Sequence, residues 1–230
     1  MNKDAKLRIV SDIMSFEKEK FNNMFINYED GIKKIHAMII GPKNTPYFGG
    51  YLFFVIIFPD NYPKTNPFVK FLTINNKVRI HPNLYANGKV CLSTLGTWPG
   101  KKWEPVNTLT SLLISISSLL NDLPIRNEPG YENIKEKDPR SICFNNYVIY
   151  NTYHLLILQV LKNKFEVSKK FTKPIKAILK ENYEELKNNI LSYKEILGKY
   201  LVHESIYYGI KEKELDFDKL CENFLKTAKV

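Results

Sequence analysis

The feature that most constrains the fold is a change of hydrophobic period between residues 35 and 72. Three short runs there, residues 35–40, 51–58 and 68–72, are rich in β-branched and aromatic side chains. Gly41-Pro42 and prolines 59, 63 and 67 separate the runs. Such residues favour strands, and Gly and Pro mark the turns between them. The sequence therefore predicts three or four antiparallel strands connected as a meander.

Helical spacing appears on both sides of the strand region. Before it, Leu7, Val10 and Met14, with Ile13 and Phe16 alongside, predict an amphipathic helix over residues 4 to about 20. Its polar face carries Lys3, Lys6 and Arg8. After it, a core helix is predicted to begin on a Thr cap at residue 108 and to stop before Pro124. The apolar positions of that helix are Leu109, Leu112, Leu113, Ile116, Leu119 and Leu120. The fold class is therefore α+β.

Past Tyr131 the apolar spacing is helical to the end of the chain, and no strand is expected there. A Lys-rich, turn-prone stretch at residues 162–174 offers the best boundary. We therefore expect two parts: residues 1–165 as an αβ core and residues 166–230 as a helical extension.

Composition narrows the class of protein. The chain has 230 residues, of which 44% are hydrophobic and 25% charged, as in ordinary globular proteins. The cysteines, Cys91, Cys143 and Cys221, are odd in number and widely spaced, so neither a disulfide framework nor a zinc site is encoded. We expect Cys143 and Cys221 to be packing residues. The first residues begin no signal peptide, and the longest apolar run is far below the roughly 20 residues that span a bilayer. We expect a cytoplasmic protein, with a nuclear location also open.

The net charge of +10 suits an anionic partner, because clustered lysines steer anions toward them. However, the chain has only four arginines, and proteins that read nucleic-acid grooves favour Arg for its bidentate geometry. We therefore do not expect nucleic acid as a partner. A nucleic-acid binder would show a steep salt dependence of binding, and this separates the two hypotheses.

Chemistry is most strongly indicated in the long aperiodic stretch at residues 75–105, since a loop of that length in a compact domain is usually functional. It contains HPNLYANGKVC, which ends at Cys91. Asn87-Gly88 predicts a tight turn that brings the Asn83 amide toward the Cys91 sulfur. A cysteine beside an amide donor, with no obvious base, suits acyl transfer by thioester exchange, because a thiol is already a good nucleophile near neutral pH.

These residues resemble the ubiquitin-conjugating enzyme family. In chain order the matching segments are the first helix, GPKNTPYFGGYLFF, FPDNYPKTNP, HPN, Cys91, W-x-P-x-x-T from Trp103 and the Ser/Leu helix. GKVCLSTLGTWPGKKWEP and NEPGYE resemble the Z-type subgroup most closely. The resemblance is strong over residues 4 to about 160. It implies the UBC fold: an N-terminal helix, a four-stranded antiparallel meander, a central core helix and an α-helical C-terminal extension.

The resemblance also implies roles at the site. Cys91 would carry the C-terminal glycine of the modifier as a thioester. Asn83 would donate to the oxyanion formed when a lysine attacks, or would hold the loop, or both. His81 and Pro82 are expected to be structural. Glu128, just before Pro129, matches a position that orients the incoming lysine, with Asp122 as a second candidate. The alternative for either carboxylate is an ordinary solvated loop residue.

Further residues are implied to bind partners. Lys3, Lys6 and Arg8 match the face that docks the activating enzyme. Lys64 and Pro105 lie in loops that contact ligases, although Lys64 replaces an aromatic residue of many relatives and leaves the class of ligase open. Trp98, on an insert at residues 96–102, is either an exposed recognition residue or a cover for the core.

The implied reaction needs no metal or cofactor, because the activating enzyme uses the ATP. The expected partners are ubiquitin or a ubiquitin-like protein, an activating enzyme, a ligase and a protein substrate, with no membrane. His36, His154 and His203 have no partner at metal-ligand spacing. The alternative is a UBC-fold scaffold that has lost catalysis, although Cys91 and Asn83 beside the HPN turn argue against it.

Overall fold

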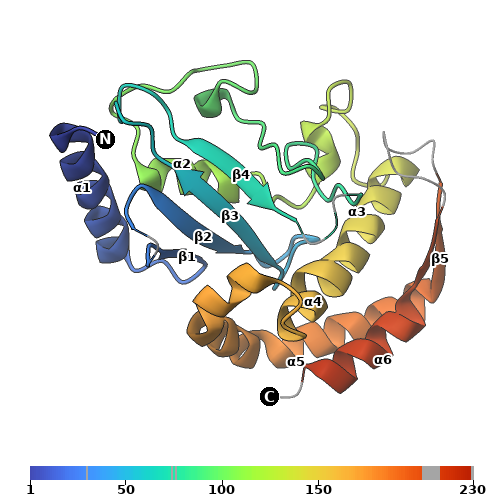
Figure 1. Ribbon diagram of the computed structural model, residues 1–230. Coiled ribbons are helices and arrows are strands. Elements are labelled where there is room, and N and C mark those ends of the chain that lie inside the picture. Colours follow the sequence, from blue (N-terminus) through green and yellow to red (C-terminus); the bar gives the residue numbers. More distant parts are fainter. Residues whose placement is uncertain (30, 74, 76, 204–212, 229–230) are drawn as a thin grey trace.

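The computed structural model describes residues 1–29, 31–73, 75, 77–203 and 213–228 (Figure 1). The strands are β1 (Met24–Asn27), β2 (Lys34–Ile40), β3 (Tyr51–Ile57), β4 (Phe68–Leu72), β5 (Lys199–Val202) and β6 (Lys213–Asp216). The α-helices are α1 (Lys3–Glu19), α2 (Leu109–Ser117), α3 (Pro139–Asn151), α4 (Leu158–Leu161), α5 (Thr172–Leu197) and α6 (Phe217–Thr227). Among these residues no helix has the length and apolar character needed to cross a bilayer.

The first four strands form one antiparallel sheet in the order β1-β2-β3-β4, so the predicted meander is confirmed. The register pairs Met38 of β2 with Phe53 of β3 and, one strand further, Phe54 with Phe71 of β4. Strand β1 was not singled out from the sequence, because it has only four residues and follows the first helix closely. The three longer strands lie where the apolar runs predict them.

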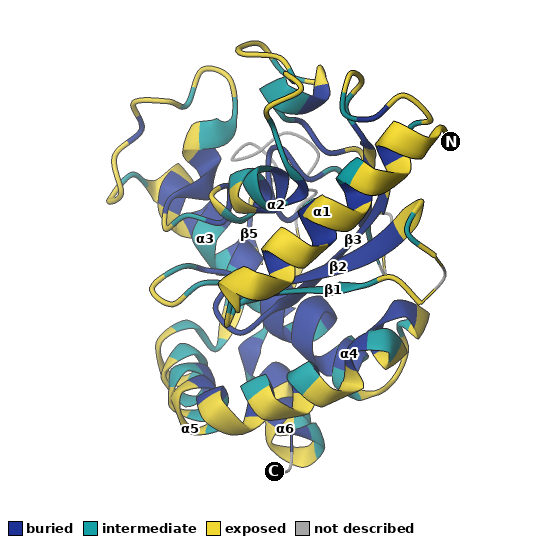
Figure 2. Cartoon of the chain, turned by 90° about the vertical axis from the view of Figure 1, so that its left-hand side faces the viewer, coloured by how far each residue is buried: buried dark blue, intermediate teal, exposed yellow. Residues whose placement is uncertain are grey.

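Strand β3 is buried on both faces of the sheet. Its residues from Tyr51 to Ile56 are all buried, which requires cover on each side. The ring of Phe53 lies 5.2 Å from that of Phe165 and 5.8 Å from that of Phe171, centroid to centroid. Figures 1 and 2 show the sheet between α1 and α2 on one side and the C-terminal helices on the other.

Helix α1 forms where expected, but only part of its apolar spacing is buried. Leu7, Val10 and Met14 are 61%, 40% and 65% exposed. Figure 2 shows an exposed stripe along the outer side of α1. The buried stripe consists of Ala5, Ile9, Asp12, Ile13 and Phe16. Of the five apolar residues that predict the helix, Ile13 and Phe16 are therefore part of the packed face, whereas Leu7, Val10 and Met14 are not. Helical spacing alone fits two neighbouring stripes, and the stripe that packs includes a buried Asp.

Helix α2 begins at its predicted cap. The Thr108 side chain accepts a hydrogen bond from the Ser111 backbone N–H, and the Ser111 hydroxyl accepts one from the Thr108 backbone N–H. The helix ends at Ser117, earlier than the apolar spacing indicates. Leu119 and Leu120 are nevertheless buried, in the turn that follows. The predicted core helix is thus confirmed, with a shorter C-terminal end.

The C-terminal part is mostly helical but contains an antiparallel hairpin, so the expectation that it has no strand was wrong. Strands β5 and β6 pair Tyr200 with Leu215 and Lys199 with Asp216. Four-residue strands are too short to establish a period of their own beside long helices. The stretch between them, residues 204–212, lies outside the described residues.

The helices of the extension share a core with the helices before it. Tyr153, in a π-helical turn at Thr152–Ile157, packs edge-on against Phe224 of α6, with ring centroids 5.4 Å apart. Its hydroxyl donates to the Leu186 carbonyl of α5 at 2.9 Å. These contacts join the two parts, and the division into residues 1–165 and 166–230 stays a prediction.

Candidate active site

The segment between His81 and Cys91 folds back on itself at the predicted Asn87-Gly88 turn. Gly88 donates to the Tyr85 carbonyl at 2.9 Å, and Tyr85 donates to the Lys89 carbonyl at 2.9 Å. Gly88 has a φ of +92°, and a Cβ there would lie 2.7 Å from the Phe71 carbonyl oxygen. Only glycine adopts this φ without strain and also leaves room for the Phe71 carbonyl oxygen. The turn can therefore pack directly against strand β4.

Asn83 and Cys91 lie opposite each other in this hairpin. The Cys91 backbone N–H donates to the Asn83 carbonyl at 2.9 Å, and the Asn83 Nδ2 donates to the Cys91 carbonyl at 2.9 Å. The amide was expected to point toward the sulfur, but its hydrogen bond goes to the backbone oxygen instead. Nδ2 carries a second hydrogen, which this bond leaves available. Oδ1 is buried with no partner among the described residues.

The Cys91 thiol is covered in this structure. The residue exposes 1% of its surface. Cys143 and Cys221 are buried as well, at 2% exposure each. Burial raises the pKa of the Cys221 thiol and disfavours its thiolate. Cys91 differs from the other two because it lies in a hairpin rather than in a helix.

His81 holds the start of the hairpin. Its Nδ1 accepts from the Asn83 backbone N–H at 2.9 Å, and its Nε2 lies 2.9 Å from the Leu119 carbonyl, to which it donates. Burial is the main cause that lowers the pKa of His81 to about 3. A neutral ring with both nitrogens engaged is a poor general base, so the geometry gives His81 a structural use.

Arg79 links the hairpin to a second loop, and sequence reasoning missed it. Its guanidinium donates to the Pro82 carbonyl, stacks 3.8 Å from the centroid of the Tyr85 ring and pairs with Glu128 at 3.5 Å. Arg79 and Glu128 are 18% and 20% exposed. One signal in the sequence was available: a rare arginine two residues before His81 in a Lys-rich chain.

The two candidate carboxylates differ in their surroundings. Glu128 follows a short helical turn (Pro124–Asn127) and is tied to the hairpin through Arg79. Asp122 lies in the turn after α2 with an exposed side chain, and its backbone carbonyl accepts from Asn145 at 3.0 Å. The structure thus joins Glu128 to the Cys91 hairpin through side-chain contacts and shows no such link for Asp122 within the described part of the chain.

The residues expected to dock the activating enzyme fall into two groups. Lys3 and Lys6 are exposed on α1. Arg8 is half-buried, and its guanidinium donates to Asp12 at 2.8 Å, to the Pro105 carbonyl at 2.9 Å and to the Asn107 carbonyl at 2.7 Å. These bonds use Arg8 to hold α1 against the loop before α2, and its docking role stays a prediction.

The residues expected at ligase loops and on the insert are at the surface. Lys64 and Pro105 are exposed, and Trp98 is half-buried. Trp103 joins the two loops, since its Nε1 donates to the Pro63 carbonyl at 2.8 Å. In the described residues no group of three or more His, Cys, Asp or Glu side chains is arranged to hold a metal ion.

Comparison with known proteins gives the same family. Residues 8–140 match the family described as ubiquitin-conjugating enzyme. The chain is 41% identical over 182 residues to "Ubiquitin-conjugating enzyme E2 Z" of Homo sapiens, which covers 78% of this chain and 50% of the relative. It is 44% identical over 160 residues to the protein of that name from Xenopus tropicalis, covering 69% of this chain and 51% of the relative.

A plant relative extends the likeness. "Probable ubiquitin-conjugating enzyme E2 25" of Arabidopsis thaliana is 45% identical over 137 residues, covering 57% of this chain and 22% of the relative. The fold and these matches define the class: the chain belongs to the ubiquitin-conjugating enzyme family, and within it to the Z type. It spans about half the length of the curated Z-type relatives it matches.

Proposed function

We propose that this chain accepts ubiquitin, or a ubiquitin-like modifier, from an activating enzyme as a thioester on Cys91 and passes it to a substrate lysine or to a ligase. The observation that carries the proposal is the pairing of Cys91 with Asn83 across a hydrogen-bonded hairpin, inside a fold whose family consists of conjugating enzymes.

The proposed chemistry consists of two acyl transfers. The Cys91 sulfur first attacks the thioester carbonyl carbon of the charged activating enzyme, whose cysteine leaves as a thiol. The amine of a lysine then attacks the new thioester, a C–N bond forms, the C–S bond breaks, and the Cys91 thiol is restored as the amine loses a proton. Both steps pass through a tetrahedral oxyanion, which a positioned N–H stabilises.

Asn83 can supply that N–H. One hydrogen of its Nδ2 binds the Cys91 carbonyl at 2.9 Å and fixes the amide against the nucleophile, which leaves the second hydrogen for the oxyanion. We propose Glu128 as the carboxylate that orients the incoming lysine. Its pairing with Arg79 supports this role, because the pair holds the carboxylate on the hairpin side of its loop. Asp122 remains the second candidate.

The proposal includes the partners and conditions of the reaction. The partners would be the modifier, the activating enzyme, a ligase and a protein substrate, with Lys3, Lys6 and Arg8 toward the activating enzyme and Lys64, Pro105 and Trp98 toward a ligase or substrate. No metal or nucleotide would be held by this chain, because the activating enzyme uses the ATP. A thiol that must stay free favours a reducing compartment, the cytoplasm or the nucleus.

A charging assay tests the proposal. The protein is mixed with an activating enzyme, ATP and ubiquitin, and is run on a gel with and without a thiol reductant. We expect an adduct that the reductant removes, that Cys143→Ser retains and that Cys91→Ser converts to a reductant-resistant ester or abolishes. If no activating enzyme and modifier give an adduct, the catalytically silent scaffold becomes the better account.

A further inference from the structure

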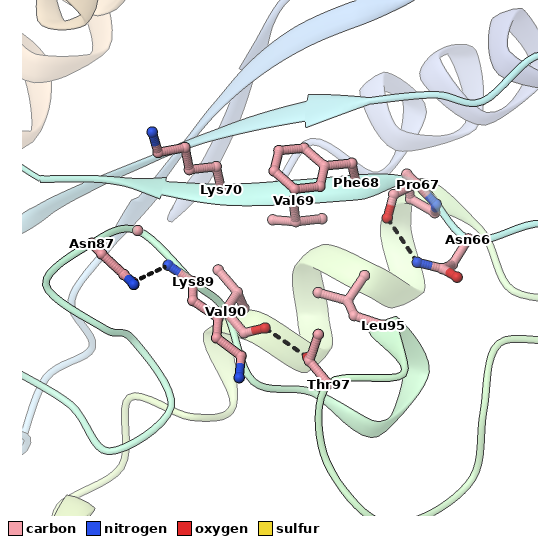
Figure 3. Close-up of a pocket in the computed structure, with 11 residues that line it drawn as sticks. Asn66, Pro67, Phe68, Val69, Lys70, Asn87, Lys89, Val90, Leu95 and Thr97 are labelled. Carbon is pink, nitrogen blue, oxygen red and sulfur yellow. Dashed lines mark hydrogen bonds between the residues drawn. The ribbon is translucent and has the colours of Figure 1, made fainter.

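The hydroxyl of Thr97 binds the backbone on both sides of Cys91. It donates to the Val90 carbonyl at 2.7 Å, a bond drawn in Figure 3, and it accepts from the Leu92 N–H at 3.0 Å. A hydroxyl has one hydrogen and two lone pairs, so both bonds can form at once. The Leu92 carbonyl, at 3.2 Å, is the more distant of two acceptors for that hydrogen. The chemistry proposed above does not use Thr97.

A short helical turn brings Thr97 back to the residues around the thiol. This turn (Ser93–Leu95) follows Leu92 and ends at Gly96, whose φ of +68° lies in the left-handed region that favours glycine. The chain reverses there, and the Thr97 N–H donates to the Leu92 carbonyl at 3.2 Å. Thr97 itself is exposed. Its position therefore depends on this turn and on its hydrogen bonds rather than on burial.

Thr97 and Asn83 together hold the two peptide planes that flank Cys91. In the plane between Val90 and Cys91, the carbonyl accepts from Thr97. The N–H of that plane donates to the Asn83 carbonyl at 2.9 Å. In the plane between Cys91 and Leu92, the carbonyl accepts from the Asn83 Nδ2 at 2.9 Å. The N–H of this second plane donates to Thr97. Each plane is thus bound at both ends.

These bonds fix the direction in which the Cys91 side chain leaves the backbone. Peptide units are planar, so φ and ψ of Cys91 are set by the relative orientation of the two planes. The proposed reaction needs this order, because the thioester carbonyl on Sγ must meet the Asn83 N–H when a lysine attacks. Without the Thr97 hydroxyl, one end of each plane would be released, and Cys91 could turn relative to Asn83 while the hairpin stays folded.

We propose that Thr97 is a positioning residue for acyl transfer: its hydroxyl holds the backbone of Cys91 so that the thioester carbonyl meets the Asn83 amide. This inference rests on the proposed function and adds a residue to its site. It also gives a use to the insert at residues 96–102, since the second residue of the insert holds the nucleophile.

Single-turnover discharge of the ubiquitin thioester tests Thr97. The protein is charged, the activating enzyme is quenched, free lysine is added, and the first-order loss of the thioester is followed. Thr97→Val keeps the shape of the side chain and removes the hydroxyl. We expect its rate constant to fall by roughly tenfold, less than the roughly 100-fold that a displacement of about 1 Å can cost, because Asn83 still binds one end of each plane. Thr97→Ser restores the hydroxyl and should transfer at close to the wild-type rate.

Thr94→Val is the matched control. It makes the same change nearer to Cys91 in the chain, where the buried Thr94 hydroxyl has no hydrogen-bond partner among the described residues. Its rate constant should equal that of the wild type. A first-order rate constant does not depend on how much of the protein is folded, so a loss of stability alone cannot produce the expected pattern.

The outcomes separate this inference from the proposed function. A Thr97→Val variant that transfers at the wild-type rate would overturn the positioning role. The same conclusion would follow if Thr97→Ser or Thr94→Val were as slow as Thr97→Val. Failure of the wild type to form any thioester would instead overturn the proposed function. A slow Thr97→Val beside fast Thr97→Ser and Thr94→Val would establish Thr97 as a positioning residue.

Discussion

At the scale of single residues, the hairpin depends on a few buried polar groups that have specific partners. His81 connects the Asn83 backbone to Leu119, and Asn83 connects back to Cys91. Each of these side chains is almost fully buried. A buried polar group without its partner costs about 1–3 kcal/mol, so the position of the thiol is tied to the integrity of this chain of hydrogen bonds.

The first prediction concerns His81 and pH. Burial lowers its pKa to about 3 in the folded state, against an ordinary value of 6.5. The unfolded chain therefore binds the proton more readily, and the stabilisation by neutral His81 is complete above pH 6.5 and is lost as the pH falls toward 3. We expect the free energy of unfolding to drop by about 2 kcal/mol from this residue between pH 7 and pH 5.

Urea titrations at the two pH values measure this drop. The His81→Asn variant has no titratable side chain at position 81. The Asn side chain can still accept a hydrogen bond from the backbone N–H two residues ahead. The stability of the variant should therefore vary less with pH than that of the wild type. Equal pH dependence in both proteins would contradict the account, because it would show that folding leaves the pKa of His81 unchanged.

The second prediction concerns Asn83. Asn83→Ala removes the donor, and we expect transfer from charged Cys91 to free lysine to slow by roughly 100-fold. The variant also leaves the Cys91 carbonyl unpaired. Single-turnover discharge measures the rate, with Asn188→Ala, exposed on α5, as a control that removes an amide far from the hairpin. Discharge of Asn83→Ala at the wild-type rate would reduce the role of Asn83 to holding the loop.

At the scale of elements, α1 and α2 are joined by one buried carboxylate. Asp12 of α1 accepts from Arg8, from the Tyr62 hydroxyl and from the Leu109 backbone N–H at the start of α2. Burial, followed by the hydrogen bond to Asp12, raises the pKa of Tyr62 and keeps its hydroxyl a donor. The carboxylate also lies at the helix N-terminus, where a negative charge is favourable.

The third prediction tests this junction. Asp12→Ala leaves the Nε of Arg8, the Tyr62 hydroxyl and the backbone N–H of Leu109 without their acceptor. Breaking a buried, hydrogen-bonded pair in this way costs roughly 3–5 kcal/mol, and the partial exposure of Arg8 places the expectation at about 3. Chemical denaturation measures it. Lys6→Ala, exposed on the same helix, should change stability by less than about 0.5 kcal/mol. Similar values for the two variants would contradict the account of the junction.

At the scale of the whole molecule, the C-terminal part covers one face of the sheet. Phe171, at the end of a short helical turn (Glu166–Phe171), is 2% exposed, and its ring packs on Phe53 of β3. Rings of the α6 helix pack on Tyr153, which lies earlier in the chain. These shared cores predict that both parts of the chain unfold together.

The fourth prediction follows from that packing. Phe171→Ala should lower the stability by about 3–5 kcal/mol. Urea unfolding is followed by fluorescence of Trp98 and Trp103, which report on the first part, and by far-UV circular dichroism, which reports on the helices. Both transitions should move together. Leu201→Ala, 45% exposed, is the control. A shift of the helical signal alone would show that the two parts unfold independently.

Local patterns explain what the sequence predicts well. The three apolar runs that become β2, β3 and β4, the Thr108 cap and the Asn87-Gly88 turn are all local signals, and all are present. The pairing of Arg79 with Glu128 and the buried Asp12 depend on contacts between distant segments, which periodicity does not encode. The same limit explains why Leu7, Val10 and Met14 are exposed on α1: tertiary packing selects between two stripes that local spacing leaves equivalent.

The central claim, that Cys91 carries the modifier, is tested most directly by mass spectrometry of the charged protein. After brief incubation with activating enzyme, ATP and ubiquitin, the intact mass should increase by that of ubiquitin less one water. A proteolytic digest under non-reducing, mildly acidic conditions should place the modification on Cys91, and thiol treatment should remove it. An adduct on a lysine, on Cys143 or on Cys221, with Cys91 free, would contradict the account.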